Sequence, residues 1–322
     1  MRQYQGAVFF VDMLGVGALT QDQVTLSERD FSAWGLSSSP LPTANLFCGQ
    51  LLTKFRHCLA SIGASHKKVK VAQLSDCAYI WSENVLAVLD AARDFMWNSV
   101  SMGLLSRGGI AYGEIVEPSK VNRSIGHFIL GGAVTRAVSL EKSGKGCRVF
   151  IDNAIYEYSE ILPGCPFEDG AVAVLKSPID GLLVREFCWY KTAGSTGDWR
   201  NDQHYAAELI ISLLTKLQHS PFFNWNELTP QGRAQLACSI DSVSQSTCEF
   251  IGNGNYLMAG EQYIESTEYH GKRCQHFFEK ILRSRMDDID RFFVNGMQKD
   301  PIHRWLESKG RLSVRIEGEK FS

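Results

Sequence analysis

The sequence predicts an α+β fold in which a central, mostly antiparallel sheet is flanked by helices and followed by a mainly helical C-terminal extension. Over the first part of the chain, strand and helix patterns follow the order β, α, β-β, α, β, α, β. The adjacent β-β pair disagrees with the strict βαβ alternation of a Rossmann domain and is typical of ferredoxin-like folds. We therefore expect a first domain over residues 1–192 and the extension over 193–322.

The strands are predicted from short apolar runs. Residues 6–12, GAVFFVD, are rich in Val and Phe and end in an aspartate, which favours a buried central strand. Residues 69–81 contain two apolar segments around Ser75 and Asp76, which predicts a hairpin with the aspartate at its tip. Paired glycines in the strand expected at 106–116 indicate a close backbone approach to another element. Three shorter strands are expected at 148–151, 171–175 and 182–187.

The helices are predicted from apolar residues that recur on one face. In the first domain they span 43–62, 85–103 and 131–144, and the third ends at a glycine. A glycine-containing turn at 13–17 and a polar stretch to about Pro42 indicate a loop insertion before the first helix. In the extension we expect helices at 204–219, 231–250 and 270–296, and a terminal strand at 310–318.

Composition excludes several classes of protein. With 33 Lys and Arg against 35 Asp and Glu, the chain gives no electrostatic reason to bind nucleic acid or an acidic membrane. No apolar stretch approaches the roughly 18–20 residues of a membrane-spanning helix, and the N-terminus lacks a signal-peptide cleavage pattern. The nine cysteines form no CxxC pair, so we expect buried, reduced thiols in a cytoplasmic protein.

Two aspartates are candidate metal ligands because of their positions. Asp12 ends an otherwise apolar strand, and Asp76 occupies a hairpin tip between apolar strands. Either residue alone is more simply a turn residue. If the two strands are neighbours, both carboxylates project from one edge of the sheet and raise each other's pKa unless a cation lies between them. Mg²⁺ and Mn²⁺ prefer such oxygen ligands.

Four segments occur in an order that matches a known family: FVDMLG at 10–15, SD at 75–76, RGGIAYGE at 107–114 and GGAVTRAVSLEKSG at 131–144. Together they resemble the motifs of the class III nucleotidyl cyclases, the adenylyl and guanylyl cyclase catalytic domains. The resemblance covers about residues 5–155, with a long insertion between the first two motifs. It implies the cyclase form of the α+β fold described above.

The resemblance also implies roles for individual residues. Asp12 and Asp76 would hold two divalent ions, Mn²⁺ or Mg²⁺, and the carbonyl of Met13 would complete the coordination of one. The resemblance implies a nucleoside triphosphate as the substrate, and divalent ions at such sites bring phosphates with them. The first motif and the arginine of the third would bind this substrate through Phe10, Gly15 and Arg107.

Two departures from the family concern the base. Purine cyclases read their base with a Lys or Glu four residues before the second metal aspartate, and that position is Ala72. Phe128 aligns with a second base-reading position, where the family has Asp or Cys. Unpaired purine groups would weaken binding here, so we expect a smaller base. UTP is favoured over CTP because the sequence shows no carboxylate to pair with the amino group of cytosine.

A third departure concerns the transition state. The family asparagine is replaced by Thr135, and the arginine four residues later by Ser139. We expect Thr135 and Arg136 to act in catalysis, although one helical step rotates Arg136 by about 100° from Thr135. The other interpretation is a degenerate cyclase domain that acts as a nucleotide-binding regulatory module.

Retained metal aspartates beside altered base-reading residues are similar to the pyrimidine cyclases of the bacterial Pycsar anti-phage system. That similarity implies a homodimer with active sites at its interface, to which the partner contributes the helix around Thr135 and Arg136. It also implies synthesis of cyclic UMP, or cyclic CMP, in antiviral defence, and a separate effector that responds to the product. A diguanylate cyclase is disfavoured because the sequence has no Gly-Gly-Asp/Glu-Glu-Phe hairpin.

Overall fold

A computed structural model describes a defined part of the chain. It covers residues 1–23, 26, 43–121, 126–155, 157, 172–176 and 183–190, with positions 232, 234, 235, 238, 239 and 242. The chain divides into two compact units. The first comprises Met1–Leu14, Leu52–Ser99 and Leu105–Gly194, and the second comprises Gly15–Leu51, Val100–Leu104 and Ser195–Ser322.

The expected C-terminal extension cannot be compared with this structure. The helices expected at 204–219 and 270–296 and the strand at 310–318 lie outside the described residues, as does most of 231–250. The domain boundary at residue 192 stays a prediction. No helix among the residues that the structure describes combines the length and apolar character needed to cross a membrane.

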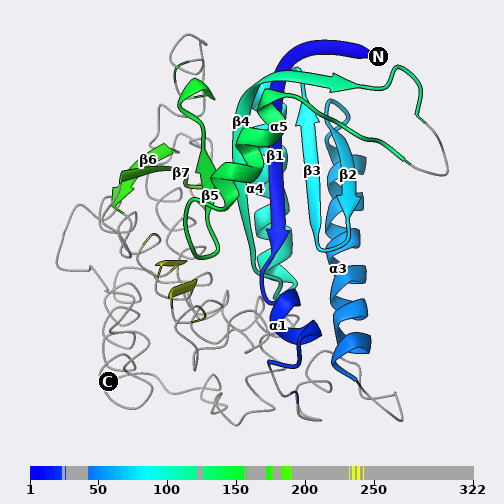
Figure 1. Cartoon of the computed structure of the whole chain (residues 1–322), viewed down its shortest axis with the longest axis vertical. Coiled ribbons are helices and arrows are strands. Elements are labelled where there is room, and N and C mark those ends of the chain that lie inside the picture. Colours follow the sequence, from blue (N-terminus) through cyan, green and yellow to red (C-terminus); the bar gives the residue numbers. More distant parts are fainter. Residues whose placement is uncertain are drawn as a thin grey trace, which may run out of the picture. The chain divides into compact units, whose positions relative to one another are not determined.

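The first unit contains a seven-stranded sheet in the order β2-β3-β1-β4-β5-β7-β6 (Figure 1). All neighbouring strands are antiparallel except the parallel pair β4 and β5. The portion β4-β1-β3-β2 has the order of a ferredoxin-like βαββαβ unit, so the predicted fold class is confirmed. The strands are β1 (Arg2–Met13), β2 (Lys70–Leu74), β3 (Cys77–Ser82), β4 (Ser106–Glu117), β5 (Val149–Ile151), β6 (Val172–Lys176) and β7 (Leu183–Phe187).

Strand β1 begins earlier than the apolar run at 6–12 predicts. Its first residues are polar, yet they continue the ladder because the long strand β4 pairs with them from Arg2↔Glu117 onward. The apolar pattern therefore predicted only the buried part of β1. Backbone pairing with β4 extends the strand toward the N-terminus.

The described helices are α1 (Val16–Thr20), α3 (Ala44–Ser65), α4 (Val85–Ser101) and α5 (Gly132–Glu141). Helices α3 and α4 cover one face of the sheet. Phe95 of α4 makes edge-to-face contacts with Phe9 of β1 at 6.2 Å and with Phe55 of α3 at 5.5 Å between ring centroids. The three expected helices of this region are confirmed, and the short α1 stands where a glycine turn was expected.

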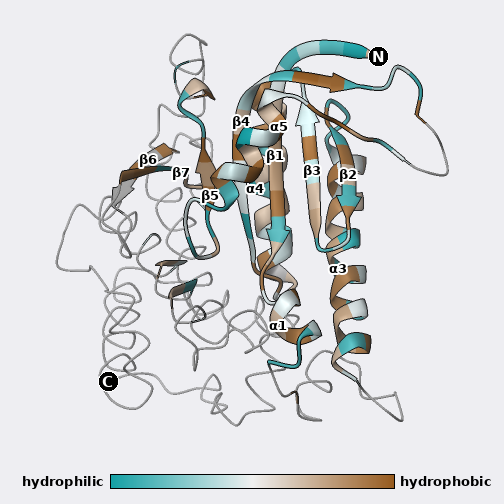
Figure 2. Ribbon diagram, viewed as in Figure 1, coloured by the Kyte–Doolittle hydropathy of each residue, from teal (hydrophilic) through white to brown (hydrophobic). Residues whose placement is uncertain are grey.

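Helix α5 packs on the opposite face of the sheet. Its small residues Ala133 and Ala137 join Val8, Phe10 and Trp81 in one buried cluster. Figure 2 shows the apolar character of the central strands beneath this helix and a hydrophilic end of β1. Successive side chains of β1 therefore point to opposite faces of the sheet. Phe9 faces α3 and α4, and Phe10 faces α5.

Two glycines in β4 allow the close approach that the sequence predicts. A Cβ atom on Gly109 would lie 2.7 Å from the Cβ of Leu140 and 2.8 Å from the backbone nitrogen of Glu141, and would also collide with the carbonyl oxygen of Ala137. A Cβ atom on Gly108 would lie 2.7 Å from the carbonyl oxygen of Phe10. The last turn of α5 therefore rests directly on the backbone of β4.

Gly109→Ala is expected to destabilise the protein by about 1–3 kcal/mol, because the new methyl group meets backbone atoms of α5 and the helix must shift. Gly63→Ala is the matched control. Gly63 lies in α3 and its Cβ would approach only Val71, at 4.0 Å, so this change is expected to stabilise the helix by about 0.5–1 kcal/mol. Urea unfolding of both variants measures the difference, and equal effects would contradict the packing described for α5.

Candidate functional site

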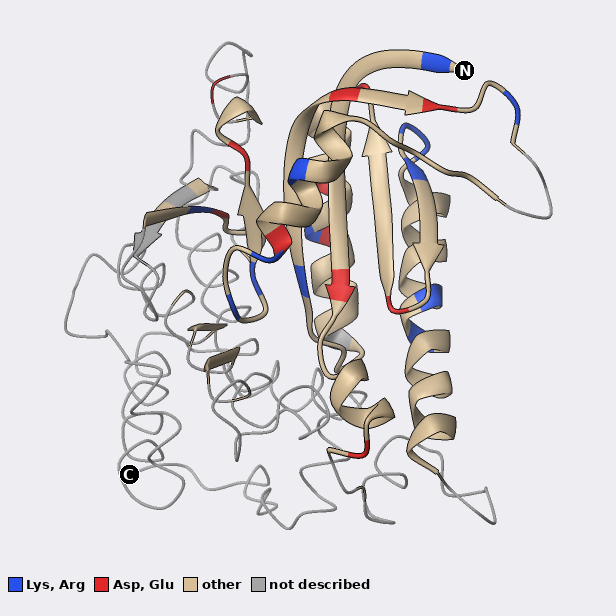
Figure 3. Ribbon diagram, in the orientation of Figure 1, with Lys and Arg blue, Asp and Glu red and all other residues tan. Residues whose placement is uncertain are grey.

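The sheet brings Asp12 and Asp76 to the same edge. Asp12 pairs with Cys77 in the β1–β3 register, and Asp76 precedes Cys77 in the turn between β2 and β3. The backbone nitrogen of Met13 donates to the carbonyl oxygen of Asp76 at 2.9 Å, which joins the two segments. Figure 3 shows acidic residues at the end of β1 and at the β2–β3 turn.

The turn that carries Asp76 depends on an unusual residue. Ser75 has a φ of +58°, a left-handed conformation that favours glycine. The side-chain nitrogen of Gln73 donates to the carbonyl oxygen of Ser75 at 2.8 Å. This bond closes the turn and fixes the backbone just before Asp76.

The electrostatics at this edge leave a deficit of positive charge. Burial, and then the carboxylates of Glu141 and Asp76, raise the pKa of Asp12 to about 7, against opposing effects of Arg107 and Lys142. Carboxylate oxygens that repel one another in this way suit a hard divalent cation. The donor set therefore fits the expected metal, although no group of three His, Cys, Asp or Glu side chains within the described ranges is placed to hold an ion.

Arg107 lies beside the two aspartates but is already bound by the protein. It pairs with Asp12 in the β1–β4 register. Its Nε donates to Oε1 of Glu141 at 2.7 Å, and its Nη2 donates to the same oxygen. The side chains of Arg107 and Glu141 are 11% and 4% exposed. The predicted phosphate-binding arginine thus reaches the site as half of a buried ion pair.

Sequence reasoning missed Glu141, although its position carried a signal. The buried residues of α5 are Ala133, Val134, Ala137 and Glu141, which follow the spacing of one helical face. A carboxylate on an apolar stripe must find a partner when it is buried. Its partner here is Arg107, which lies 34 positions away in the sequence.

Phe10 and Ala72, both predicted to bind the substrate, lie on the α5 face of the sheet. Phe10 pairs with Tyr79, and Tyr79 pairs with Ala72, across β1, β3 and β2. The rings of Phe10 and Tyr79 are 5.0 Å apart. Phe10 and Asp12 are two residues apart in one strand, so both project from this face. The result is an apolar surface that ends at the acidic pair.

Phe128 does not join that surface among the described contacts. It lies two residues before Leu130, whose backbone pairs with Val116 near the end of β4. Its side chain is 50% exposed, and it is absent from the buried cluster beneath α5 as the structure describes it. The expected contact of Phe128 with a base stays a prediction.

The guanidinium of Arg136 is hydrogen-bonded to residues near the sheet. Its Nε donates to Oδ2 of Asp152 at 3.0 Å, and its Nη2 donates to the carbonyl oxygen of Tyr112. A side chain on Gly113 would collide with this guanidinium. Thr135 and Ser139 are exposed, and their hydroxyls bond within the helix. Arg136 is therefore bonded to Asp152 and to the backbone of β4 within this chain.

Gly15 occupies the turn that follows Asp12. It has a φ of +98° and stands at the N-cap of α1. A side chain would be strained in this left-handed conformation, so the residue type suits the turn that the sequence predicts. Its expected contact with phosphate stays a prediction.

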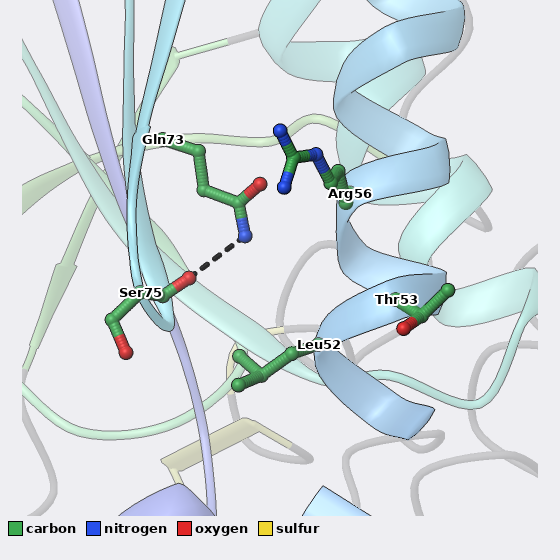
Figure 4. Close-up of a pocket in the computed structure, with 5 residues that line it drawn as sticks. All are labelled: Leu52, Thr53, Arg56, Gln73 and Ser75. Atoms are coloured by element: carbon green, nitrogen blue, oxygen red, sulfur yellow. Dashed lines mark hydrogen bonds between the residues drawn. The ribbon is translucent and has the colours of Figure 1, made fainter. Parts of the chain in front are cut away.

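A pocket of about 300 Å³ lies behind the turn that carries Asp76. It is lined by Leu52, Thr53, Arg56, Gln73 and Ser75, and Figure 4 shows the guanidinium of Arg56 reaching from α3 toward Gln73. Gln73 and Ala72 are adjacent in β2, so their side chains project from opposite faces of the sheet. The pocket is therefore distinct from the apolar surface.

Comparison with known proteins gives similarities to solved cyclase domains. The adenylyl cyclase CyaB from P. aeruginosa is 14% identical with a TM-score of 0.38, over 57% of this chain and 93% of that chain. The guanylate cyclase domain of RhGC from Catenaria anguillulae, in complex with GTP, is 14% identical with a TM-score of 0.36, over 58% of this chain and 97% of that chain. No protein-family model and no curated protein matches the sequence.

Without divalent cations, the protein is expected to lose stability as the pH rises from about 4 to about 7. Asp12 titrates at about 7 when folded and near the ordinary value of 3.8 when unfolded, so over this range the folded state binds the extra proton. The stabilisation of the folded state by protonation of Asp12 is complete below pH 3.8 and is lost as the pH rises through about 7. Asp12→Asn removes this dependence.

Thermal unfolding in a chelator at pH 5 and pH 8 tests this expectation. The Tm of Asp12→Asn minus that of wild type should increase from pH 5 to pH 8. Asp90→Asn, at an exposed position of α4, serves as the matched control and should show no such increase. A Tm difference for Asp12→Asn that is independent of pH would contradict the electrostatic description.

Proposed function

We propose that this protein is a metal-dependent nucleotidyl cyclase that converts UTP to cyclic UMP and pyrophosphate. One observation carries the proposal: Asp12 and Asp76 lie at one edge of the sheet, with Arg107 paired to Asp12 on the next strand. Paired carboxylates beside an arginine suit a magnesium or manganese triphosphate. A domain without this chemistry has no need of paired carboxylates at one edge of the sheet.

The proposed reaction is an intramolecular phosphoryl transfer. The ribose 3′ oxygen forms a bond to the α-phosphorus and loses its proton, while the bond from the α-phosphorus to the pyrophosphate oxygen breaks. Two Mn²⁺ or Mg²⁺ ions held by Asp12 and Asp76 would favour ionisation of the 3′-hydroxyl and neutralise charge on the pyrophosphate. In this proposal the carbonyl of Met13 would complete the coordination of one of the two ions. The backbone at Gly15 and the guanidinium of Arg107 would bind phosphate oxygens.

The preference for a pyrimidine is supported by the apolar surface. Phe10, Tyr79 and Ala72 are register partners across three strands, and Phe10 lies two residues before Asp12 in β1. At the Ala72 position a purine would find no side-chain group to satisfy its edge, whereas a smaller base needs fewer polar contacts. Uracil is preferred to cytosine in this proposal, with cyclic CMP as the alternative product.

The exposed face of α5 supports a role for a second subunit. Thr135 and Ser139 are exposed, so in a homodimer they would be available to the partner's active site. We propose that Thr135 acts there, with Arg136 beside it. A cyclic pyrimidine nucleotide made in this way would act on a separate effector in antiviral defence.

A degenerate, nucleotide-binding regulatory module is the second candidate. It is favoured by the contacts of Arg136, whose guanidinium bonds Asp152 and the Tyr112 carbonyl and is thereby held away from Thr135 and Ser139. Such a module would bind a nucleoside triphosphate without turning it over.

Asp12→Ala and Asp76→Ala are each expected to lower turnover about 10³-fold or more, because several kcal/mol of charge stabilisation at the phosphates is lost. Asp90→Ala is the control for removal of an exposed carboxylate and should retain full turnover. The measurement is cyclic nucleotide formation with Mn²⁺, on variants whose circular dichroism matches wild type. Full turnover by a folded Asp12→Ala, Asp76→Ala double variant would eliminate the metal assignment.

Substrate choice is tested by mass spectrometry after separate incubation with ATP, GTP, CTP and UTP in the presence of Mn²⁺. We expect a cyclic monophosphate from UTP, and less or none from CTP, because the base contacts an apolar surface. A cyclic purine as the main product would contradict the assignment of Ala72. Nucleotide binding without any product would favour the regulatory module.

A further inference from the structure

The buried carboxylate of Glu141 has no role in the scheme above, although it lies at the centre of the site. Glu141 is the last residue of α5 and is 3% exposed. It influences Asp12 electrostatically, and Asp12 is in turn the register partner of Arg107. A buried carboxylate in such a position must be balanced by a nearby positive group.

The backbone of β4 holds Glu141 in place. Because Gly109 has no side chain, the backbone nitrogen of Glu141 approaches the strand closely. Arg107 is two residues earlier in the same strand, so the last turn of α5 and the start of β4 meet at this point. The position of the carboxylate is therefore set by packing of the backbone and not by a flexible side chain alone.

The geometry of the ion pair defines the orientation of the guanidinium. One oxygen of Glu141, Oε1, accepts from both Nε and Nη2 of Arg107. Two donors on one side of a planar group fix both its position and its plane. The side chain of Arg107 is 11% exposed, which leaves little room for another arrangement.

We propose that Glu141 is a positioning residue that holds the guanidinium of Arg107 at the phosphate site beside Asp12. This inference rests on the proposed function, because the group to be positioned is the arginine assigned to the triphosphate. Glu141 acts through Arg107 and binds neither metal nor nucleotide. Its removal should weaken phosphate binding more than it slows the chemical step.

The chain offers a matched control in a second buried pair. Arg148 and Glu186 are 3% and 0% exposed, and Nε of Arg148 donates to Oε2 of Glu186 at 2.7 Å. Glu186 lies in β7, and Arg148 immediately precedes β5. Glu186 is not among the groups that shift the pKa of Asp12. Loss of either pair should reduce stability, but only loss of the Glu141 pair should change phosphate binding.

The experiment compares Glu141→Ala, Glu141→Gln and Glu186→Gln in the full chain, with kcat and KM measured for UTP with Mn²⁺. We expect Glu141→Ala to raise KM about tenfold or more, since about 1.4 kcal/mol of binding corresponds to tenfold, with kcat within about threefold of wild type. Glu141→Gln keeps one acceptor and should raise KM by a smaller factor of at least about threefold. Glu186→Gln should lower Tm without changing KM.

If Glu141→Ala fails to fold, the Glu141→Gln and Glu186→Gln pair decides the question. A KM for Glu141→Gln within twofold of wild type, together with a lowered Tm, would show a merely structural role and overturn the proposal.

A binding measurement separates failure of this inference from failure of the proposed function. Inorganic pyrophosphate with Mn²⁺ is titrated into wild type and the same variants by calorimetry. If wild type makes no cyclic nucleotide, the proposed function fails, yet weaker pyrophosphate binding by Glu141→Gln than by Glu186→Gln still supports the positioning role. Equal pyrophosphate affinity in wild type, Glu141→Gln and Glu186→Gln overturns it.

Discussion

The backbone register of β1 between β3 and β4 determines which side chains meet at the functional edge. It places Asp12 beside Cys77 on one side and Arg107 on the other. Because side chains alternate between the faces of a strand, a shift of one residue would turn Asp12 toward α3 and α4 and Phe9 toward α5. Burial of Phe9 on one face of the sheet and of Phe10 on the other fixes the register of β1. The same register determines the face from which the carboxylate of Asp12 projects.

The same register concentrates negative charge. Burial, and then the carboxylates of Glu141 and Asp76, raise the pKa of Asp12 at this edge, and Arg107 and Lys142 oppose them only in part. A fold under no functional constraint would avoid this arrangement, since each buried charge without compensation reduces stability. In the proposed function, a divalent cation would balance these carboxylates and would add the positive charge that a triphosphate requires. The repulsion that lowers the stability of the protein without the ion would then favour binding of the ion.

The parts of the site that follow from short-range pattern could be predicted from the sequence. Asp12 and Asp76 interrupt apolar strands, and a strand end and a hairpin tip are local features. The glycine pair in β4 also predicted a close approach, but the sequence does not say that α5 makes it. Glu141 was missed because its partner lies on a distant strand, even though its place on the buried face of α5 was visible in the spacing.

The contacts of Arg136 were harder to foresee for the same reason. Its partner Asp152 comes from beyond β5, and the space for its guanidinium depends on Gly113 in β4. Helical rotation alone predicted that Arg136 would not coincide with the Thr135 position, but not where it would go. Phe128, to which a motif alignment assigned a role at the base, is half exposed, and that role stays a prediction.

Binding of Mn²⁺ tests the central claim most directly, because it asks whether the paired carboxylates hold a cation irrespective of any reaction. The experiment is a titration of the metal-free protein with Mn²⁺, in which electron paramagnetic resonance measures the free ion. We predict that wild type binds Mn²⁺ and that a folded Asp12→Asn, Asp76→Asn double variant binds at least about tenfold more weakly, a difference of about 1.4 kcal/mol. Equal binding by the two proteins, or no binding by wild type, would contradict the account.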